Sequence, residues 1–311
     1  MHLYGNLDEL PETPLEPVAT LGNFDGVHRG HQSILSKLMT EAERMQVPSM
    51  VITFYPHPRQ LLRPKEPFLP IMSLKERLRR LWDLGIDHIL VLPFDHDMAE
   101  MTAQEFVDEI LWEKLRVTAM YVGPYTQFGH NREGDVKFLE SAGRRFGFSV
   151  GEVEPIYLNG KRISSSWARE SVVSGQLDHA ARIMGRHFQL AGEVVQGDQR
   201  GRELGYPTAN ILASPTVLPK PGVYAAWATL PDGSRKAAAV NLGIRPTFEG
   251  TDPTIEAHIL EFEGELYGEE LFLSLVSFVR PENKFGNAKQ LKLQIRRDIV
   301  EVKRALGLLK K

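Results

Sequence analysis

Residues 18–31 are VATLGNFDGVHRGH, and this stretch decides the fold of the first half of the chain. The apolar run Val18–Leu21 has the length and composition of a buried strand. Glycine follows at once, and apolar residues at helical spacing begin a few positions later, at Ile34, Leu35, Leu38 and Met39. The stretch therefore predicts a strand, a glycine-rich loop and a helix over residues 32–45.

The same alternation continues outward as far as residue 185. Apolar runs predict further strands at 50–54, 89–92 and 119–122. Between them, Ser73 with Glu76 and Thr102 with Glu105 have the spacing of capping boxes, which begin helices. Strands that alternate with helices are typical of a parallel sheet covered by helices. We therefore predict an α/β domain over residues 1–185.

The pattern changes near Gly185, after which the chain becomes rich in strand-like segments. These lie at 188–195, 222–230, 236–242, 254–262 and 270–279, with Asp232-Gly233 as a hairpin turn. One last helix carries an apolar face made of Leu291, Ile295, Ile299, Val302 and Leu306. Short antiparallel strands with a closing helix predict a small β-barrel over residues 186–311.

The composition excludes several classes of protein. The 311 residues are 42% hydrophobic and 25% charged, with a net charge of -3, which is typical of a globular enzyme and disfavours a nucleic-acid binder. The chain has no cysteine, which suits the reducing cytoplasm. Residues 1–17 lack the apolar core of a signal peptide, and we expect no membrane span. Nothing in the sequence decides whether copies of the chain form a homo-oligomer.

The loop between the first strand and its helix predicts a phosphate site. Gly22, Gly26 and Gly30 allow sharp turns and close approach of a ligand, and the helix N-terminus attracts anions. His28 and His31 are three residues apart, so both face one side of the first helical turn. Two other interpretations stay open: a pair of zinc ligands, or incidental histidines in a turn.

A second candidate site begins at Gly197, where a glycine-rich loop with two arginines ends at Gly205. Directly after it, Pro207 fixes the backbone, and Thr208 and Asn210 offer oxygen atoms of the kind that Mg²⁺ prefers. The plainer interpretation is a polar turn that leads into the Ile211-Leu212 segment.

Glu256 is the third candidate, and its setting is unusual. In the alternating run 254–262 it shares a face with His258, Leu260 and Phe262. A carboxylate beside apolar neighbours on a strand is normally paired or used in chemistry. The alternative is a glutamate that simply faces solvent.

The first loop resembles the Gly-x-Phe-Asp-x-x-His-x-Gly-His signature of the nucleotidyltransferase superfamily. More narrowly, it resembles the N-terminal half of the bacterial bifunctional riboflavin kinase/FMN adenylyltransferase family, the prokaryotic FAD synthetases. Three later stretches resemble that family too, at 55–58 (YPHP), 128–135 (FGHNREGD) and 163–169 (ISSSWAR).

This resemblance implies that one set of residues holds the triphosphate of ATP during adenylyl transfer. His28, His31 and Arg169 would stabilise the leaving pyrophosphate, with the nucleotide bound by Gly22, Asn23, Phe24, Asp25, Gly26, Ser164, Ser165 and Ser166. Taken alone, the serines and Arg169 would serve equally well as a cap for the following helix.

One segment departs from the family pattern. The family usually has Asp or Asn and then an aromatic residue before the Phe-Gly pair, where this chain has Pro124-Tyr125-Thr126-Gln127. In the family this segment helps to hold the nucleotide or the flavin. The departure motivates one rival hypothesis, a riboflavin kinase whose adenylyltransferase domain is weakened or inactive.

Residues 197–210 resemble the riboflavin kinase signature Gly-Asp-x-x-Gly-Arg-x-Leu-Gly-x-Pro-Thr-Ala-Asn position for position, and further matches extend over most of residues 190–300. The resemblance implies an ATP site at Gly201, Arg202, Gly205 and Pro207, with Mg²⁺ on Thr208 and Asn210. It gives Glu256 the role of general base and places the flavin near Glu282 and Phe285. Taken alone, these last two residues could simply begin the closing helix.

The two resemblances together imply an enzyme that uses ATP and Mg²⁺ twice. Riboflavin would be phosphorylated to FMN by the second domain and adenylylated to FAD by the first, so the partners would be riboflavin, FMN and ATP. Besides the kinase alone, a second rival is a non-catalytic regulator that binds flavin or nucleotide. The presence of Glu256 argues against the regulator, because binding alone needs no base.

Overall fold

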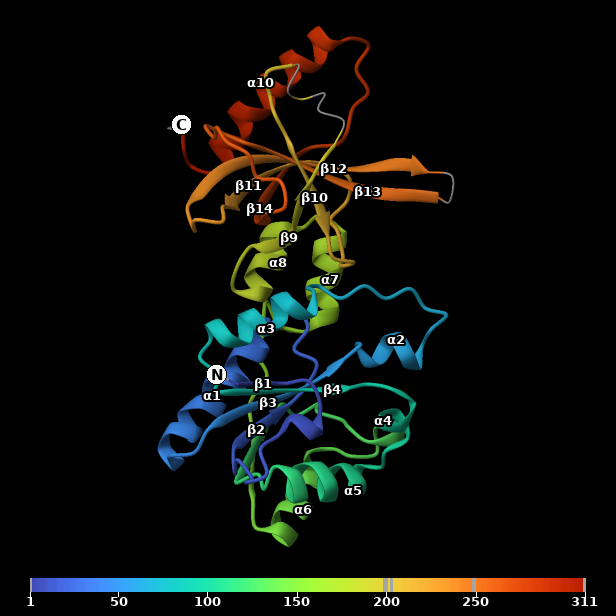
Figure 1. Cartoon of the computed structure of the whole chain (residues 1–311), viewed down its shortest axis with the longest axis vertical. Coiled ribbons are helices and arrows are strands. Elements are labelled where there is room, and N and C mark those ends of the chain that lie inside the picture. The colour runs from blue at the N-terminus through green and yellow to red at the C-terminus, as the bar shows by residue number, and fades with distance from the viewer. Residues whose placement is uncertain (1, 198–200, 202–203, 248–249, 310–311) are drawn as a thin grey trace. The chain divides into compact units, whose positions relative to one another are not determined.

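The computed structural model describes residues 2–197, 201, 204–247 and 250–309 (Figure 1). The chain divides into two compact units, Met1–Ser165 and Ser166–Lys311. We predicted the division at residue 185, where the sequence becomes rich in strands. Helix α8 (Leu177–Met184) contacts the barrel strands β9 (Phe188–Val195) and β14 (Glu270–Arg280), so it packs with the second unit. The boundary between the two functional domains stays a prediction.

The first unit contains a parallel sheet, as predicted, and the sheet has six strands. Its strands are β1 (His2–Tyr4), β2 (Val18–Leu21), β3 (Ser49–Tyr55), β4 (His88–Pro93), β5 (Ala119–Val122) and β6 (Ser149–Glu152), in the order β1-β4-β3-β2-β5-β6. The two edge strands, β1 and β6, were not predicted. They are short and contain no fully buried residue, so they lack the apolar run that marks the inner strands.

Helices cover both faces of this sheet (Figure 1). On one face, α1 (Arg29–Met45) and α3 (Leu74–Asp83) pack on the strands through Leu35, Leu38 and Leu81. The opposite face is covered by α5 (Ala103–Glu105), the π-helix η2 (Phe106–Lys114) and α6 (Val136–Phe146). Both predicted capping boxes are present, at the starts of α3 and α5. Shorter elements complete the unit: η1 (Leu7–Glu9), α2 (Pro58–Leu62), α4 (His96–Glu100), η3 (His130–Arg132), β7 (Tyr157–Leu158) and β8 (Lys161–Arg162).

The strand order fixes where this sheet can bind a ligand. From β2 the chain moves through β3 and β4 toward one edge, and it later returns to place β5 and β6 on the other side of β2. In open parallel sheets, the crevice at such a reversal, at the carboxyl ends of the strands, is where ligands bind. The loop that follows β2 contains the glycines and begins α1, so it lies at this crevice.

The second unit contains a closed antiparallel barrel with the strand order β10-β13-β12-β11-β14-β9. Its other strands are β10 (Ala209–Ala213), β11 (Gly222–Thr229), β12 (Arg235–Thr247) and β13 (Gly250–Ile259), and the unit also holds α7 (Ser165–Val173) and the closing helix α10 (Ala288–Ala305). This confirms the predicted barrel and closing helix.

Two details of the barrel differ from prediction. Strand β10 was not among the predicted strands, because polar residues reach as far as Asn210 and leave only a short apolar run after it. Strand β13 ends at Ile259 and not at Phe262, since Glu261 takes a left-handed conformation with φ 56°. Phe262 therefore lies beyond the strand and does not continue the face of Glu256 as expected.

The closing helix is held to the barrel by a buried ion pair. Arg280, at the end of β14, donates two hydrogen bonds to the carboxylate of Asp298 on α10, at 2.8 and 2.7 Å. Their side chains are 16% and 7% exposed. Gln294 donates a third hydrogen bond to Asp298, at 2.8 Å. This network joins α10 to the strand that precedes Glu282 and Phe285.

We expect Arg280→Met to destabilise the second unit by about 3 kcal/mol, because it leaves the Asp298 carboxylate buried without its cation. The measurement is the urea concentration at which riboflavin phosphorylation is lost. Glu261→Gln, which removes the exposed pair between Glu261 and Lys303, serves as the control and should leave this midpoint unchanged. Equal shifts in the two variants would contradict the prediction.

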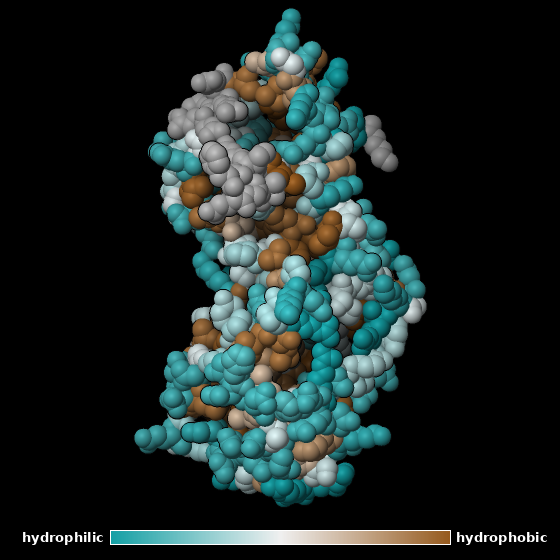
Figure 2. Space-filling view, turned by 90° about the vertical axis from the view of Figure 1, so that its right-hand side faces the viewer, coloured by the Kyte–Doolittle hydropathy of each residue, from teal (hydrophilic) through white to brown (hydrophobic). Residues whose placement is uncertain are grey.

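Hydrophilic residues cover most of the face of the molecule drawn in Figure 2, and hydrophobic residues form separate patches on it. Among the residues that the structure describes, no helix combines the length and the hydrophobicity needed to cross a membrane.

Candidate active sites

The loop after β2 has a backbone shape that its glycine makes possible. Phe24, Gly26 and Val27 all have positive φ angles, of 50°, 82° and 38°. A Cβ on Gly26 would lie 2.9 Å from the Cδ1 atom of Ile71, so a side chain there would both strain the backbone and clash. The loop thus turns tightly between the end of β2 and the start of α1.

His28 and His31 are brought together at the N-terminus of α1, as predicted from their spacing. His28 is the N-cap residue and is 6% exposed, and its Nδ1 accepts the backbone N–H of His31 at 3.3 Å. Since Nδ1 is an acceptor, the N–H of the neutral ring lies at Nε2. The two imidazole rings stack with centroids 3.6 Å apart. Both rings therefore lie at the positive end of the helix, where an anion is stabilised.

Asp25 supports the loop from inside the protein. Its side chain is 2% exposed, and Oδ1 accepts the backbone N–H of Ile71 at 2.9 Å. Its carbonyl accepts a hydrogen bond from the Ser165 hydroxyl, also at 2.9 Å. Asp25 and Ser165, both predicted to bind the nucleotide, therefore make a contact that joins residues 163–165 to the loop.

The remaining predicted residues of this site lie in two places. Gly22 approaches Phe24 closely, because a Cβ there would be 3.2 Å from the Phe24 ring. The Asn23 carbonyl faces α3, where it accepts a hydrogen bond from Arg77. Ser164 lies just before α7, and Ser166 and Arg169 lie on it in the second unit. The role of Arg169 in the adenylyl site stays a prediction.

The segment that departs from the family pattern forms a turn stabilised by a cation–aromatic contact. The Thr126 N–H donates to the Gly123 carbonyl at 3.0 Å. The guanidinium of Arg162, on β8, lies 3.7 Å from the centre of the Tyr125 ring. Tyr125 is 61% exposed, so this segment offers a solvated aromatic surface where the family usually has a polar anchor.

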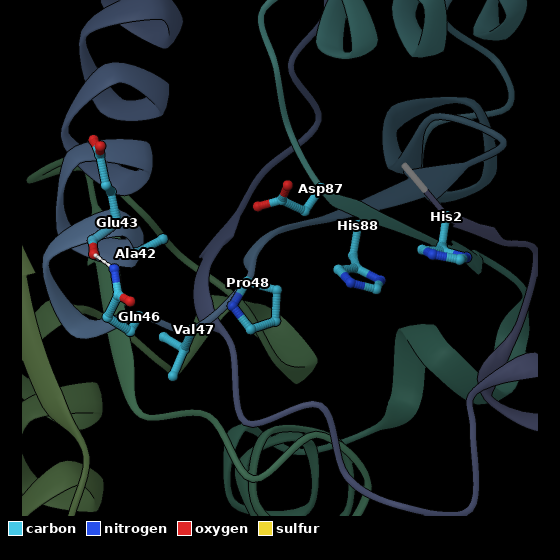
Figure 3. Close-up of a pocket in the computed structure, with 8 residues that line it drawn as sticks. All are labelled: His2, Ala42, Glu43, Gln46, Val47, Pro48, Asp87 and His88. Atoms are coloured by element: carbon cyan, nitrogen blue, oxygen red, sulfur yellow. Dashed lines mark hydrogen bonds between the residues drawn. The ribbon is translucent and has the colours of Figure 1, made fainter.

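An open cavity of about 470 Å³ lies elsewhere on the first unit (Figure 3). His2, Pro48, Asp87 and His88 line it, together with residues from the end of α1. His2 and His88 begin β1 and β4, and Pro48 directly precedes β3, so the cavity is at the amino ends of the strands. It is therefore at the opposite edge of the sheet from the histidine loop.

The zinc interpretation of His28 and His31 finds no support in the described residues. Among them, no three His, Cys, Asp or Glu side chains are grouped so that they could hold a metal ion. The loop thus offers two imidazoles and a helix N-terminus, a donor set that suits a polyphosphate.

In the second unit, three polar residues on adjacent strands form a row across the barrel: Asn210, Glu256 and Asn241. Glu256 on β13 is directly opposite Asn210 on β10 and directly opposite Asn241 on β12. Residues that are directly opposite in antiparallel strands point to the same face and lie close together. Ile255, Ala257 and Ile259 fill the barrel interior, so the row lies on the outer face. Glu256 itself is partly buried, between the two asparagines.

Glu282 joins the end of this row. Its Oε1 accepts a hydrogen bond from the Asn241 amide at 3.2 Å, and the same oxygen lies 2.6 Å from where a Cβ on Gly243 would be. Glycine at 243 thus makes room for this carboxylate. Helix α10 begins at Ala288 with Asn287 as its cap, so Glu282 and Phe285 precede the helix and do not begin it. Phe285 packs near the Arg280 guanidinium, 5.7 Å from its ring centre.

The predicted metal ligands lie at the start of β10, against two glycines. A Cβ on Gly197 would lie 2.1 Å from the Asn210 side-chain nitrogen, and one on Gly201 would lie 3.2 Å from the Thr208 hydroxyl oxygen. The Tyr206 N–H donates a hydrogen bond to the Gly201 carbonyl at 2.8 Å.

Pro207, Gly205 and Arg202 complete the predicted nucleotide loop. The Pro207 carbonyl accepts a hydrogen bond from Nδ1 of His258 at 2.8 Å, which ties the turn to β13. Gly205 has a φ of 79°, a conformation that favours glycine. Arg202 lies outside the described residues.

Three residues that support these sites were not predicted: Arg77, Asn241 and His258. Each acts through a contact with a distant part of the chain, so its own sequence neighbourhood gives no signal. Asn241 would have emerged from a correct strand register, since it is opposite Glu256. His258 was placed on the face of Glu256 but was given no role.

Comparison with known proteins bears on both sites. A family model described as FAD synthetase matches residues 10–167, and one described as riboflavin kinase matches residues 184–306. A curated protein of Escherichia coli (strain K12), named bifunctional riboflavin kinase/FMN adenylyltransferase, is 37% identical over 312 residues, which cover 100% of this chain and 99% of that protein. The protein of the same name from Pseudomonas fluorescens is 38% identical over 283 residues, covering 91% and 90%.

Among solved structures, one described as a macrolide-efflux protein from Streptococcus pneumoniae is similar over nearly its whole length. The TM-score is 0.86, the sequence identity is 29%, and the match covers 97% of this chain and 98% of that one. The histidine loop falls in the first matched family segment, and Asn210 and Glu256 fall in the second.

Proposed function

The chain belongs to the family of bifunctional riboflavin kinase/FMN adenylyltransferases, and we propose that its two activities use the two groups of residues described above. The enzyme phosphorylates riboflavin to FMN with ATP, and it adenylylates FMN to FAD with release of pyrophosphate. Its substrates are therefore riboflavin, FMN and ATP. What we propose is the assignment of individual residues and of Mg²⁺ to each reaction.

For the kinase reaction, Glu256 acts as the general base. It takes the proton from the terminal ribityl hydroxyl of riboflavin as that oxygen attacks the γ-phosphorus and ADP leaves. The observation that carries this assignment is the row in which Glu256 lies between Asn210 and Asn241. The two asparagines flank Glu256 on the outer face of the barrel. Glu282, at the end of the row, and Phe285 bind the flavin.

Thr208 and Asn210 suit Mg²⁺, because their hydroxyl and amide oxygens are hard ligands. Gly197 and Gly201 have no side chain, which lets the backbone lie close to both residues. Bound there, Mg²⁺ would neutralise charge on the phosphates of ATP. The glycine loop, including Gly201, Arg202 and Gly205, supplies N–H donors to the same phosphates.

For the adenylyl reaction, a phosphate oxygen of FMN attacks the α-phosphorus of ATP. The new O–P bond forms as the bond to pyrophosphate breaks, and no covalent enzyme intermediate is needed. His28 and His31 hold the β- and γ-phosphates at the N-terminus of α1 and stabilise the charge that grows on the leaving pyrophosphate. The stacked imidazoles at the helix N-terminus carry this assignment.

One assay tests the whole assignment of activities. The protein is incubated with riboflavin, ATP and Mg²⁺, and the flavins are separated by chromatography over time. We expect FMN to appear first and FAD to follow. FMN that accumulates without FAD, even when supplied directly, would overturn the adenylyl assignment, and a lack of any FMN would overturn the kinase assignment.

We expect Thr208→Val to raise the Mg²⁺ concentration needed for half-maximal FMN formation by about tenfold, because it removes one hydroxyl ligand and keeps the shape of the side chain. The measurement is a Mg²⁺ titration of FMN formation at fixed ATP. Thr229→Val, on β11, is the matched control. An unchanged Mg²⁺ requirement in Thr208→Val would contradict the role of Thr208 as a ligand.

A further inference from the structure

Arg77 is a buried cation behind the histidine loop. It lies on α3 and is 5% exposed. Its Nη1 donates to the Asn23 carbonyl at 2.6 Å, and its Nη2 donates to the Phe54 carbonyl at 2.9 Å. Asn23 lies in the loop that follows β2, and Phe54 is near the end of β3. A single guanidinium from α3 thus joins the carboxyl ends of the two strands.

Burial of this group is costly unless its hydrogen bonds compensate for the lost water. Burial lowers the pKa of the Arg77 guanidinium, and the nearby charge of Asp25 opposes that change. Arginine remains protonated in such surroundings, so a permanent cation stands behind the loop. A methionine or leucine would fill the same space without this cost. The fixed, planar pair of donors is therefore the property that this position uses.

Arg77 is connected to the histidines through Asn23 and Phe24, which lie in the loop between them. Asn23 directly precedes Phe24, whose left-handed backbone begins the tight turn. The Phe24 ring packs against the His31 ring, with centroids 5.0 Å apart, and the Phe24 carbonyl accepts the Val27 N–H at 3.0 Å. A shift of the Asn23 carbonyl would thus move Phe24, and Phe24 would move the imidazole that it contacts.

We propose that Arg77 is a positioning residue for adenylyl transfer, which clamps the Asn23 and Phe54 carbonyls and so holds the histidine loop in its reactive shape. This inference rests on the proposed adenylyl site at His28 and His31. Arg77 acts through the loop and does not touch the substrate. A displacement of about 1 Å at a reacting group can cost roughly 100-fold in rate, so the loss of one clamp is sufficient for a large effect.

The test compares Arg77→Met and Arg77→Lys with the unaltered chain, with FMN supplied and ATP varied. We expect Arg77→Met to raise KM for ATP about tenfold and to lower kcat for FAD formation about tenfold, because the loop contacts the triphosphate both before and during the reaction. Arg77→Lys keeps the charge but has no planar pair of donors. We therefore expect it to change KM for ATP and kcat by about threefold each. FMN formation in the same samples should keep its kcat and KM.

Two further variants make the result decisive. Arg145→Met removes an exposed arginine of the same unit, which pairs with Asp108 at 3.0 Å, and should leave both activities unchanged. His28→Asn tests the site itself. If His28→Asn impairs FAD formation and both Arg77 variants do not, the positioning role is wrong and the site stands. If all of these variants leave FAD formation unchanged, the proposed site is wrong as well.

A purely structural role for Arg77 predicts a different pattern. Partial unfolding of the first unit would lower kcat at an unchanged KM for ATP, and cooling would restore the rate. That outcome, in either Arg77 variant, would overturn the proposal. A raised KM for ATP that persists on cooling supports it.

Discussion

Glu256→Gln should lower the rate of FMN formation by roughly 1,000-fold and leave the adenylylation of supplied FMN unchanged. General-base catalysis contributes about 100- to 10,000-fold, and glutamine keeps the size of the side chain while losing the ability to take the ribityl proton. The measurement is the initial rate of riboflavin phosphorylation at saturating ATP, with FAD formation from added FMN followed in parallel.

The position of Glu256 makes this substitution a clean test. It lies on the outer face of the barrel, away from the apolar residues that fill the interior, so glutamine should preserve the fold. The matched control is Glu263→Gln, at an exposed position after β13, which should leave both rates unchanged. A loss of both activities in Glu256→Gln would argue against separate sites.

The sequence was sufficient to predict those parts of the fold that local patterns encode. The apolar run Val18–Leu21, the capping boxes at Ser73 and Thr102 and the spacing of His28 and His31 all depend on residues within a few positions of one another. The structure confirms each of them. The inner strands of a parallel sheet are buried on both faces, so they give a strong signal.

What could not be predicted depends on contacts between distant residues. The face of Glu256 is set by strand register, and a single strand does not reveal which face is inward. Arg77 contacts Asn23, which is 54 positions away in the chain, and Phe54, which is 23 positions away. Strand β10 was missed because its first residues, Ala209 and Asn210, continue a polar segment and only a short apolar run follows them.

Replacing His28 by Asn should lower FAD formation from supplied FMN by roughly 100- to 1,000-fold, the cost of one charge-stabilising donor at a reacting centre. Asparagine is among the best N-cap residues, so it should still accept the His31 N–H and preserve the start of α1. The substitution therefore separates the imidazole from the helix cap. The measurement is pyrophosphate release at saturating FMN and ATP.

The controls for His28→Asn come from the same chain. His88→Asn removes an imidazole from the cavity at the opposite edge of the sheet (Figure 3) and should leave adenylylation unchanged. Riboflavin phosphorylation should be unaltered in both variants, which reverses the pattern expected for Glu256→Gln. If His28→Asn instead retained full adenylylation, the stacked imidazoles would not be the groups that receive the pyrophosphate charge. The phosphate-binding role would then fall to the backbone of the loop and the N-terminus of α1 alone.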